Sequence, residues 1–473
     1  MNNAKGKPRR WRRIAKWACV LLAVAVNIVA IEAIRAASLK PSITTDYAKQ
    51  INDLTFAQVP PGHSRREWRE LTGVVSSLTP RFPTGNETSP DIVVDALTAD
   101  DIAALRQLPS LAYAIKRLQP DRSIAAQVAP LVDEGLNTSP LRGAARLIRC
   151  RLEVALAGQQ PDIAAESLDQ LDALATVSCV QPAYLSYLTG SAIEALTTGT
   201  IRQALIEGRI SPEMARLLLT ALTNARPKPA APLYQVNIAL SQAFDQAQRT
   251  FTDDGDNCGT LILTAYNTHI ADANPLTPEH EAYITSLHGE MPDYTHWRYN
   301  MFQWRLPSRL ESLGKFAEAI NEIVADSQKP ASQRRSPDAW KARRAARTSL
   351  TENIFTQAVA LESAASIGDA EASKRGGTLL QLALMAHKHR VGTYPASLEQ
   401  LVPTELSALP TDLLALDGRY IYRVDGDNYV LYSVAADGVD NQGAMRSTEA
   451  FRVFYNGDLA AGHDFVFSSN VEF

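Results

Sequence analysis

The sequence has few cysteines, few aromatic residues and no strong excess of charge. Its 473 residues include four cysteines, and no two of these form a C-x-x-C pair, which excludes a zinc ribbon and a thioredoxin-type motif. Aromatic residues make up 7% of the chain and the formal net charge is -4, so we expect no nucleic-acid partner. Cys150, Cys179 and Cys258 leave two alternatives open, one disulfide or buried free thiols.

The usual catalytic signatures are also missing from the sequence. It contains no Walker loop, no G-x-G-x-x-G, no G-x-S-x-G elbow and no H-E-x-x-H. The densest aromatic stretch, Tyr294 to Arg305, interleaves rings with arginines and could bind a ligand by stacking, although such a stretch is more often core. We therefore expect a protein that is not an enzyme, and we expect no catalytic residue.

The N-terminus has the order of residues that is typical of a membrane anchor. Seven lysines and arginines, with no acidic residue, precede the apolar run from Trp17 to Ile31. Extended over residues 14–34, a helix would span about 31 Å, which matches the roughly 30 Å hydrocarbon core of a bilayer. The positive-inside rule then predicts a basic cytoplasmic tail over residues 1–13 and a transmembrane signal anchor over 14–34.

The alternative interpretation of this segment is a cleaved signal peptide, because small residues stand at Ala23 to Val26. Both interpretations place the bulk of the chain outside the cytoplasm. We expect a bacterial inner-membrane protein with a single pass, a cytoplasmic N-terminus and the lipid bilayer as its partner through residues 14–34.

The middle of the chain predicts helices in succession. A linker over residues 35–62 leads into an α-helical extracytoplasmic region over 63–350, in which apolar residues recur every three or four positions. Ser211 is a predicted N-cap and Pro212 the first helical residue after it. The stretch from Leu313 to Pro330 resembles half of a tetratricopeptide unit, but no second copy follows at a fixed period, and an amphipathic helical hairpin explains it as well.

The C-terminal region, residues 351–473, predicts an apolar helix followed by a small sheet. The helix "GGTLLQLALMAHKHR" carries a stripe of Leu379, Leu382, Ala383 and Ala386, which Leu380 and Leu384 widen. Gly392 then supplies a left-handed cap, Pro395 keeps the connection extended, and Ser397 with Gln400 predicts a capping box for a short second helix.

The hydrophobic period changes from helical to two after this short helix. "RYIYRV" and "NYVLYSV" flank Asp425-Gly426, which is a hairpin signal, and "AFRVFY" and "DFVFS" are two further candidate strands. The fold class that we expect is mainly α, with an N-terminal transmembrane helix, a long α-helical region and a small C-terminal α+β domain of one helix on an antiparallel sheet.

The stretch "HRVGTYPASLEQL…LPTD…DGRYIYRVDGDNYVLYSVAADGVDNQG" resembles the head domain of the major pseudopilins of type II secretion. The resemblance runs from Lys374 to Phe467, about a fifth of the chain. The whole chain resembles a group of large planctomycete-type membrane proteins that carry this head behind a long helical region. The pseudopilin processing motif is absent, since Gly6 is followed by Lys7.

The resemblance implies a calcium site in the D-G loop of the head. It places Ser433 and Asp437 at that loop and offers Asp464 or Asp440 as the second aspartate. Oxygen ligands suit a hard cation such as Ca²⁺, although a tight turn in which Asp437 bonds its own backbone is the alternative. The function that we expect is a structural or interaction role in the cell envelope with envelope protein partners; the alternative is an envelope hydrolase or a ligand-binding helical scaffold.

Overall fold

The computed structural model describes residues 8–47, 49–51, 64–78, 98–106, 139–179, 184–224, 231–253, 255, 258–262, 308–336, 339–340, 342–343, 358–435, 437–443 and 464–467. Helices account for 67% of these residues, and the three strands form one small antiparallel sheet near the C-terminus. The prediction of a mainly α chain with a small α+β part is therefore confirmed. The chain divides into two compact units, of which one comprises Met1–Asp46, Gln242–Glu318 and Arg344–Thr356 and the other the remaining residues.

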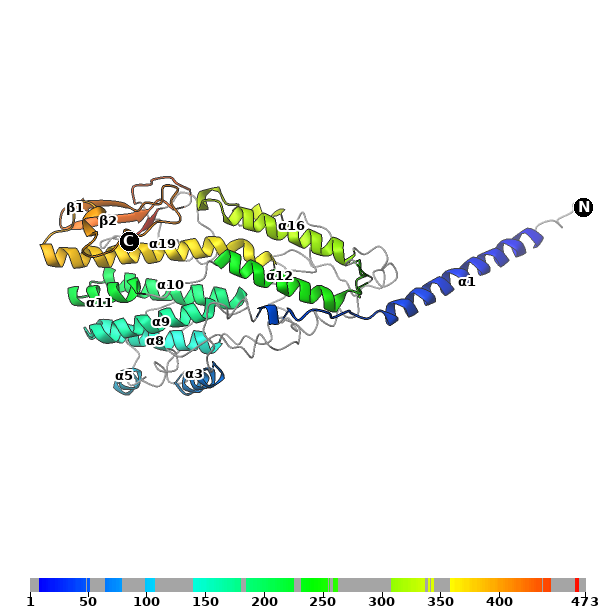
Figure 1. Cartoon of the computed structure of the whole chain (residues 1–473), viewed down its shortest axis with the longest axis horizontal. Coiled ribbons are helices and arrows are strands. Elements are labelled where there is room, and N and C mark those ends of the chain that lie inside the picture. The colour runs from blue at the N-terminus through cyan, green and yellow to red at the C-terminus, as the bar shows by residue number, and fades with distance from the viewer. Residues whose placement is uncertain are drawn as a thin grey trace, which may run out of the picture. The chain divides into compact units, whose positions relative to one another are not determined.

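The α-helices lie at the following positions (Figure 1): α1 (Pro8–Ser38), α3 (Ser64–Leu78), α5 (Ala99–Arg106), α8 (Ser139–Ala157), α9 (Pro161–Cys179), α10 (Tyr184–Ile206), α11 (Pro212–Thr223), α12 (Ala231–Thr250), α16 (Arg309–Ser327) and α19 (Ala358–Val391). The predicted start of α11 is confirmed, because Pro212 is its first residue and the Ser211 Oγ accepts a hydrogen bond from the Met214 N–H at 3.3 Å. The predicted tetratricopeptide-like stretch is helical over most of its length as α16.

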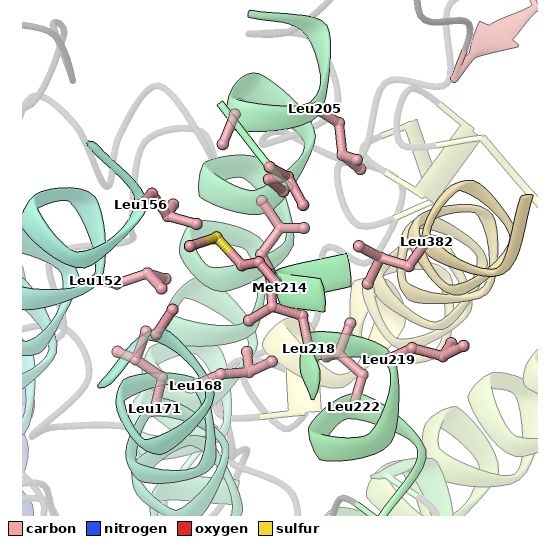
Figure 2. Packing of buried hydrophobic residues seen from close by; sticks show 14 of the residues in the cluster. Leu152, Leu156, Leu168, Leu171, Leu205, Met214, Leu218, Leu219, Leu222 and Leu382 are labelled. Carbon is pink, nitrogen blue, oxygen red and sulfur yellow. The ribbon is translucent and has the colours of Figure 1, made fainter. Parts of the chain in front are cut away.

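The core of the larger unit is built by α8, α9, α10, α11 and α19, which pack against one another. Figure 2 shows leucines from all five helices and Met214 of α11 meeting in this core. Each such side chain contributes about 1.5–3 kcal/mol when it is fully buried. One hydrophobic cluster runs without interruption from Leu71 of α3 to Phe467 in the sheet, so the helices and the sheet share a single core.

The 34-residue helix α19 belongs to both parts of this unit. It packs against α10 and α11. It also packs against strand β2 and against the short helix that follows α19 in the chain. The predicted apolar stripe is buried at Leu382, Ala383 and Ala386, while Leu379 is half-buried. Leu380 and Leu384 are completely buried as well, because α19 is covered by helices and by the sheet.

A single arginine joins four helices at the middle of α19. Arg375 lies 3.1 Å from Asp172 of α9 and 3.4 Å from Glu194 of α10. Its Nη2 also donates to the Leu222 carbonyl at the end of α11, at 2.7 Å. This carbonyl belongs to the last turn of α11 and also accepts from the Asn224 N–H, so the guanidinium of Arg375 adds a charged donor at the negative end of the helix dipole.

The turn after α19 forms as predicted, but the capping box does not. Gly392 has φ +93° and its N–H donates to the Lys388 carbonyl at 2.7 Å. The following helix is a single 3₁₀ turn, η4 (Leu398–Leu401), in which Ser397 makes no capping hydrogen bond. The Ser397 side chain bonds the Glu399 carboxylate instead, and the Gln400 Oε1 accepts from the Ala396 N–H at 2.9 Å.

The sheet consists of β1 (Ile421–Asp425), β2 (Asn428–Ser433) and β3 (Phe465–Val466), in the order β1-β2-β3. The predicted hairpin is confirmed, since Asp425 pairs with Asn428 across a turn in which Gly426 has φ +59°. The predicted strand in "DFVFS" is confirmed as β3, which pairs with β2 through Tyr432↔Val466. The predicted strand in "AFRVFY" lies outside the described residues.

The predicted anchor, residues 14–34, lies within α1, which begins inside the predicted basic tail and ends at Ser38. Large apolar side chains along α1 are exposed, among them Trp17, Leu21, Val26, Ile31 and Ile34. Within the described part of the chain, no helix has the length and apolar character that a bilayer crossing requires.

The cysteines are free thiols in the structure. Cys150 and Cys179 are buried, and Cys19 and Cys258 are exposed. Burial raises the pKa of Cys150 to about 11, so this thiol is protonated and inert at neutral pH. The interpretation as buried free thiols therefore fits Cys150 and Cys179, but not Cys258.

Candidate functional site

The candidate site lies in the head, where the sheet and its loops pack on α19 at two adjacent glycines. A β-carbon on Gly376 would overlap the Tyr420 hydroxyl, and one on Gly377 would overlap the ring of Phe467. The bare helix surface thus lets two aromatic side chains approach the α19 backbone. The Tyr420 hydroxyl uses this proximity to donate to the Ser373 carbonyl at 2.7 Å.

The loop before β1 is fastened to the same turn of α19. The Ser373 Oγ accepts hydrogen bonds from the backbone N–H groups of Leu413 and Leu414, at 2.9 and 3.2 Å. Asp412, the aspartate of the L-P-T-D sequence, is completely buried, and its Oδ1 accepts from the Leu414 N–H at 3.0 Å. The L-P-T-D turn is therefore a structural connection that fixes the start of the sheet on α19.

An arginine of α10 packs on the two aromatic rings of the segment Phe465–Phe467. The guanidinium carbon of Arg202 lies 4.7 Å from the ring centre of Phe465 and 5.5 Å from that of Phe467. Burial lowers the pKa of Arg202 to about 10, and the charge of Glu371 on α19 opposes this shift. Arg202 remains cationic at neutral pH, so the contact is a desolvated cation–π interaction of the kind worth about 2 kcal/mol.

Three of the four predicted calcium ligands form tight turns of the D-G loop. The buried Ser433 Oγ accepts from the Ala435 N–H at 3.0 Å, and the Asp437 Oδ1 accepts from the Val439 N–H at 3.0 Å. The Asp440 Oδ1 accepts from the Tyr432 hydroxyl at 2.8 Å and from the Gln442 N–H at 2.7 Å. The alternative interpretation, in which Asp437 bonds its own backbone, is present in the structure.

The fourth predicted ligand, Asp464, is buried immediately before β3. Its Oδ2 accepts from the Gly443 N–H at 2.7 Å and so closes the loop, while its Oδ1 is buried and makes no hydrogen bond with the described residues. Burial raises the pKa of Asp464, the backbone N–H groups of Gly443 and Asn441 lower it, and the charges of Asp440 and Asp437 raise it. A carboxylate in this position carries a charge that its surroundings destabilise.

The backbone of the D-G loop is unusually curved. Two residues with side chains, Ala435 and Gln442, adopt left-handed conformations with φ of +54° and +62°, and Gly438 and Gly443 do so as well. Non-glycine residues pay about 1–2 kcal/mol for this conformation, and they gather where a loop has to hold a defined shape. The curvature is what brings the Gly443 N–H back to Asp464.

The donor chemistry of this loop fits a hard cation. All four predicted residues offer oxygen atoms, and the buried Oδ1 of Asp464 has no hydrogen-bond partner among the residues that the structure describes. Among the residues that the structure describes, no three histidine, cysteine, aspartate or glutamate side chains gather around one point. A cation at Asp464 would therefore be completed by serine or carbonyl oxygens rather than by a cluster of carboxylates.

The other predicted candidate, the aromatic stretch from Tyr294 to Arg305, lies outside the described residues. Sequence reasoning did not identify the contact between Arg202 and the Phe465–Phe467 segment, because the partners are far apart in the chain and neither belongs to a motif. It also passed over Gly376 and Gly377, although two glycines inside an otherwise strong apolar helix are a signal of close packing.

Comparison with known proteins adds no relative: no family model, no curated protein and no solved structure matches the chain.

Proposed function

We propose that the chain is a membrane-anchored interaction protein of the bacterial cell envelope, with a cytoplasmic N-terminus and a pseudopilin-like head outside the cytoplasm. The helix α1 would hold it in the bilayer through residues 14–34. The larger unit would meet envelope protein partners and would not catalyse a reaction.

The observation that carries the proposal is the exposure of apolar side chains along α1. Trp17, Leu21, Leu22, Ile31 and Ile34 are each more than 60% exposed, and they follow directly on the basic run that precedes Trp17. A helix with this pattern gains most by entering a bilayer with its basic end on the cytoplasmic side.

The packing of the larger unit supports a role in which the helices hold the head in a fixed position for a partner. Because α19 is one continuous helix that packs on α10, α11 and β2, a partner that binds the head is coupled rigidly to the helices. The resemblance of residues 374–467 to pseudopilin heads supports a location in the cell envelope close to a secretion-type or pilus-like machine.

We also propose that the D-G loop binds Ca²⁺ through Asp464, with the Ser433 hydroxyl, loop carbonyl oxygens and no more than one of Asp440 and Asp437 as the other ligands, since the three aspartates do not gather around one point. When bound, the cation would neutralise the buried charge of Asp464 and tie β3 to the loop. Its contribution would be structural, because these residues already hold the loop closed without it.

Reporter fusions test the proposed topology on the full chain. Alkaline phosphatase fused after Phe473 should be active in cells, and a fluorescent protein that matures only in the cytosol should stay dark there. A bright cytosolic fusion would contradict the proposal.

A charge substitution tests the anchor independently. Val26→Arg and Ile28→Arg should each release the protein from carbonate-washed membranes, because an arginine at the centre of the span costs about 2.5–3.5 kcal/mol. Val391→Arg is the matched control, since Val391 is also an exposed apolar residue but lies at the end of α19. Equal membrane retention of all three variants would rule out anchoring through α1.

A further inference from the structure

The smaller unit contains a glutamine that binds the chain segment following α1. Gln248 lies in the last turns of α12 and is 1% exposed. Its Oε1 accepts hydrogen bonds from the backbone N–H groups of Thr44 and Thr45, both at 3.1 Å. Its Nε2 donates to the Thr45 carbonyl at 2.8 Å.

The remaining amide hydrogen of Gln248 fixes the side chain in place. Nε2 donates to the Asp245 Oδ1 at 3.0 Å, and the other oxygen of Asp245 pairs with Arg249 at 2.7 Å. Both acceptor positions and both donor positions of the amide are therefore used, three of them on the backbone of the segment. A buried amide that is fully satisfied in this way holds its partner in one register.

The bound segment has no secondary structure of its own. Residues 39–46 form neither helix nor strand, the Thr44 side chain is exposed, and the three hydrogen bonds from Gln248 to the segment all involve main-chain atoms. Gln248 thus fixes the backbone of Thr44 and Thr45 on α12 and leaves only a short connection between this point and the end of α1.

We propose that Gln248 is a latch that converts the connection after α1 into a short tether. Between Ser38, the last residue of α1, and Thr44 lie the five residues 39–43. The six Cα–Cα steps from Ser38 to Thr44 (44 − 38) span at most about 22 Å, so the latched chain keeps the end of α1 within that distance of the bound Thr44. The role of the tether rests on the proposed membrane anchoring, because the tether would then limit the distance between α12 and the bilayer.

Amide hydrogen exchange on the full-length protein tests the latch. In the wild type, the amides of Thr44 and Thr45 should exchange at least tenfold more slowly than those of an unstructured chain. Gln248→Ala should remove this protection, while the protection of α9 and α10 should stay unchanged. Asn237→Ala is the matched control, since Asn237 is an exposed side chain on the same helix.

A second variant separates the latch from a general loss of folding. Gln248→Glu keeps an oxygen acceptor for the two N–H groups but loses both donated hydrogen bonds and places a charge beside Asp245. Its protection at Thr44 and Thr45 should fall between those of the wild type and Gln248→Ala. Unprotected Thr44 and Thr45 amides in the wild type, or protection that persists in Gln248→Ala, would overturn the proposal. Exchange is measured without reference to topology, so a failed reporter fusion and a failed latch are distinguishable results.

Discussion

The ring of Phe467 occupies the space into which a β-carbon on Gly377 would project. The two residues are 90 positions apart (467 − 377), and their contact places the last described residue of the chain directly on the backbone of α19. The Phe467 carbonyl accepts a short hydrogen bond from the Gln381 Nε2 one turn further along the helix. The close approach of ring and helix is thus fixed from two sides.

Substitution of Gly377 by alanine should destabilise the protein. The added methyl group overlaps a buried ring that is packed between the rings of Tyr420 and Phe465, and overpacking of this kind costs about 1–3 kcal/mol. Gly199→Ala in α10 is the control, because nothing lies within 4 Å of its added β-carbon, and it should gain up to about 1 kcal/mol from helix propensity. Urea unfolding of the full chain measures both. Equal stabilities would show that Phe467 does not pack on Gly377.

Substitution of Arg375 by glutamine should be more costly than substitution of a surface arginine. It removes the partner that Asp172, Glu194 and the Leu222 carbonyl share, and breaking a buried ion pair typically costs about 3–5 kcal/mol. Arg343→Gln breaks only an exposed pair with Glu322 and should cost less than about 1 kcal/mol. The two free energies of unfolding are compared in the same titration. A difference below about 1 kcal/mol would mean that Arg375 does not join the four helices.

Substitution of Asp464 by asparagine removes the charge of this side chain but keeps its hydrogen bond in the loop, so it should show how the charge alone affects stability. Since the pKa of Asp464 is raised in the folded state, its charge opposes folding, and this penalty appears as the pH rises above 3.8, the ordinary value. Asparagine keeps an acceptor for the Gly443 N–H, so Asp464→Asn should equal or exceed the wild type in stability when a chelator is present.

Calcium should reverse that order. A ligand present at 100 times its dissociation constant stabilises the folded state by about 2.7 kcal/mol, which the wild type should gain and Asp464→Asn should lose. Thermal melts with Ca²⁺ and with chelator provide the measurement, and Mg²⁺ serves as the control ion. If Ca²⁺ shifts neither protein, the D-G loop is a tight turn and not a metal site.

Acidification should weaken the C-terminal end of α19 through His387. Burial lowers the pKa of this histidine, and the positive charge of Arg390, whose Nη2 lies 3.3 Å from its Nδ1, lowers it further; Glu405 has the opposite effect. The unfolded chain therefore binds the proton more tightly than the folded one. Stability should fall as the pH drops below 6.5, the ordinary value of a histidine.

The measurement for His387 is the melting temperature as a function of pH between about 7.5 and 5. His387→Gln should reduce the slope in this range, while His389→Gln, at an exposed position two residues on, should leave it unchanged. A slope that is the same in all three proteins would assign the acid sensitivity to other groups.

The sequence predicted those features of the fold that depend on neighbouring residues. The Ser211 cap, the Gly392 turn and the hairpin at Gly426 each need only a few consecutive residues, and each forms as expected. The capping box at Ser397 is the exception. In the single 3₁₀ turn the Gln400 N–H donates to the Ser397 carbonyl, so it is not left for the Ser397 side chain as it would be in an α-helix.

The features that sequence reasoning missed depend on residues far apart in the chain. Arg202 contacts the ring of Phe465, 263 positions further along the chain (465 − 202). The pattern of apolar and polar residues in one segment does not predict which distant segment it will pack against. The same holds for the latch, where Gln248 binds the backbone of Thr44 and Thr45 and thus recognises no side chain at all. Of the candidate calcium ligands, the local turns of Asp437 and Asp440 could be anticipated, whereas the burial of Asp464 could not.

The late position of strand β3 in the sequence affects when the helical core can finish packing during synthesis. Ribosomes deliver residues 465–467 after every other described segment, yet these residues cover Arg202 of α10 and fill the space beside Gly377. The helices therefore leave the ribosome before the residues that cover Arg202 and Gly377, and they reach their final packing only after residues 465–467 have been added. A chain that ends shortly before Phe465 would thus have a defect in the helical core as well as in the sheet, and a larger unfolded fraction of it would be open to proteolysis.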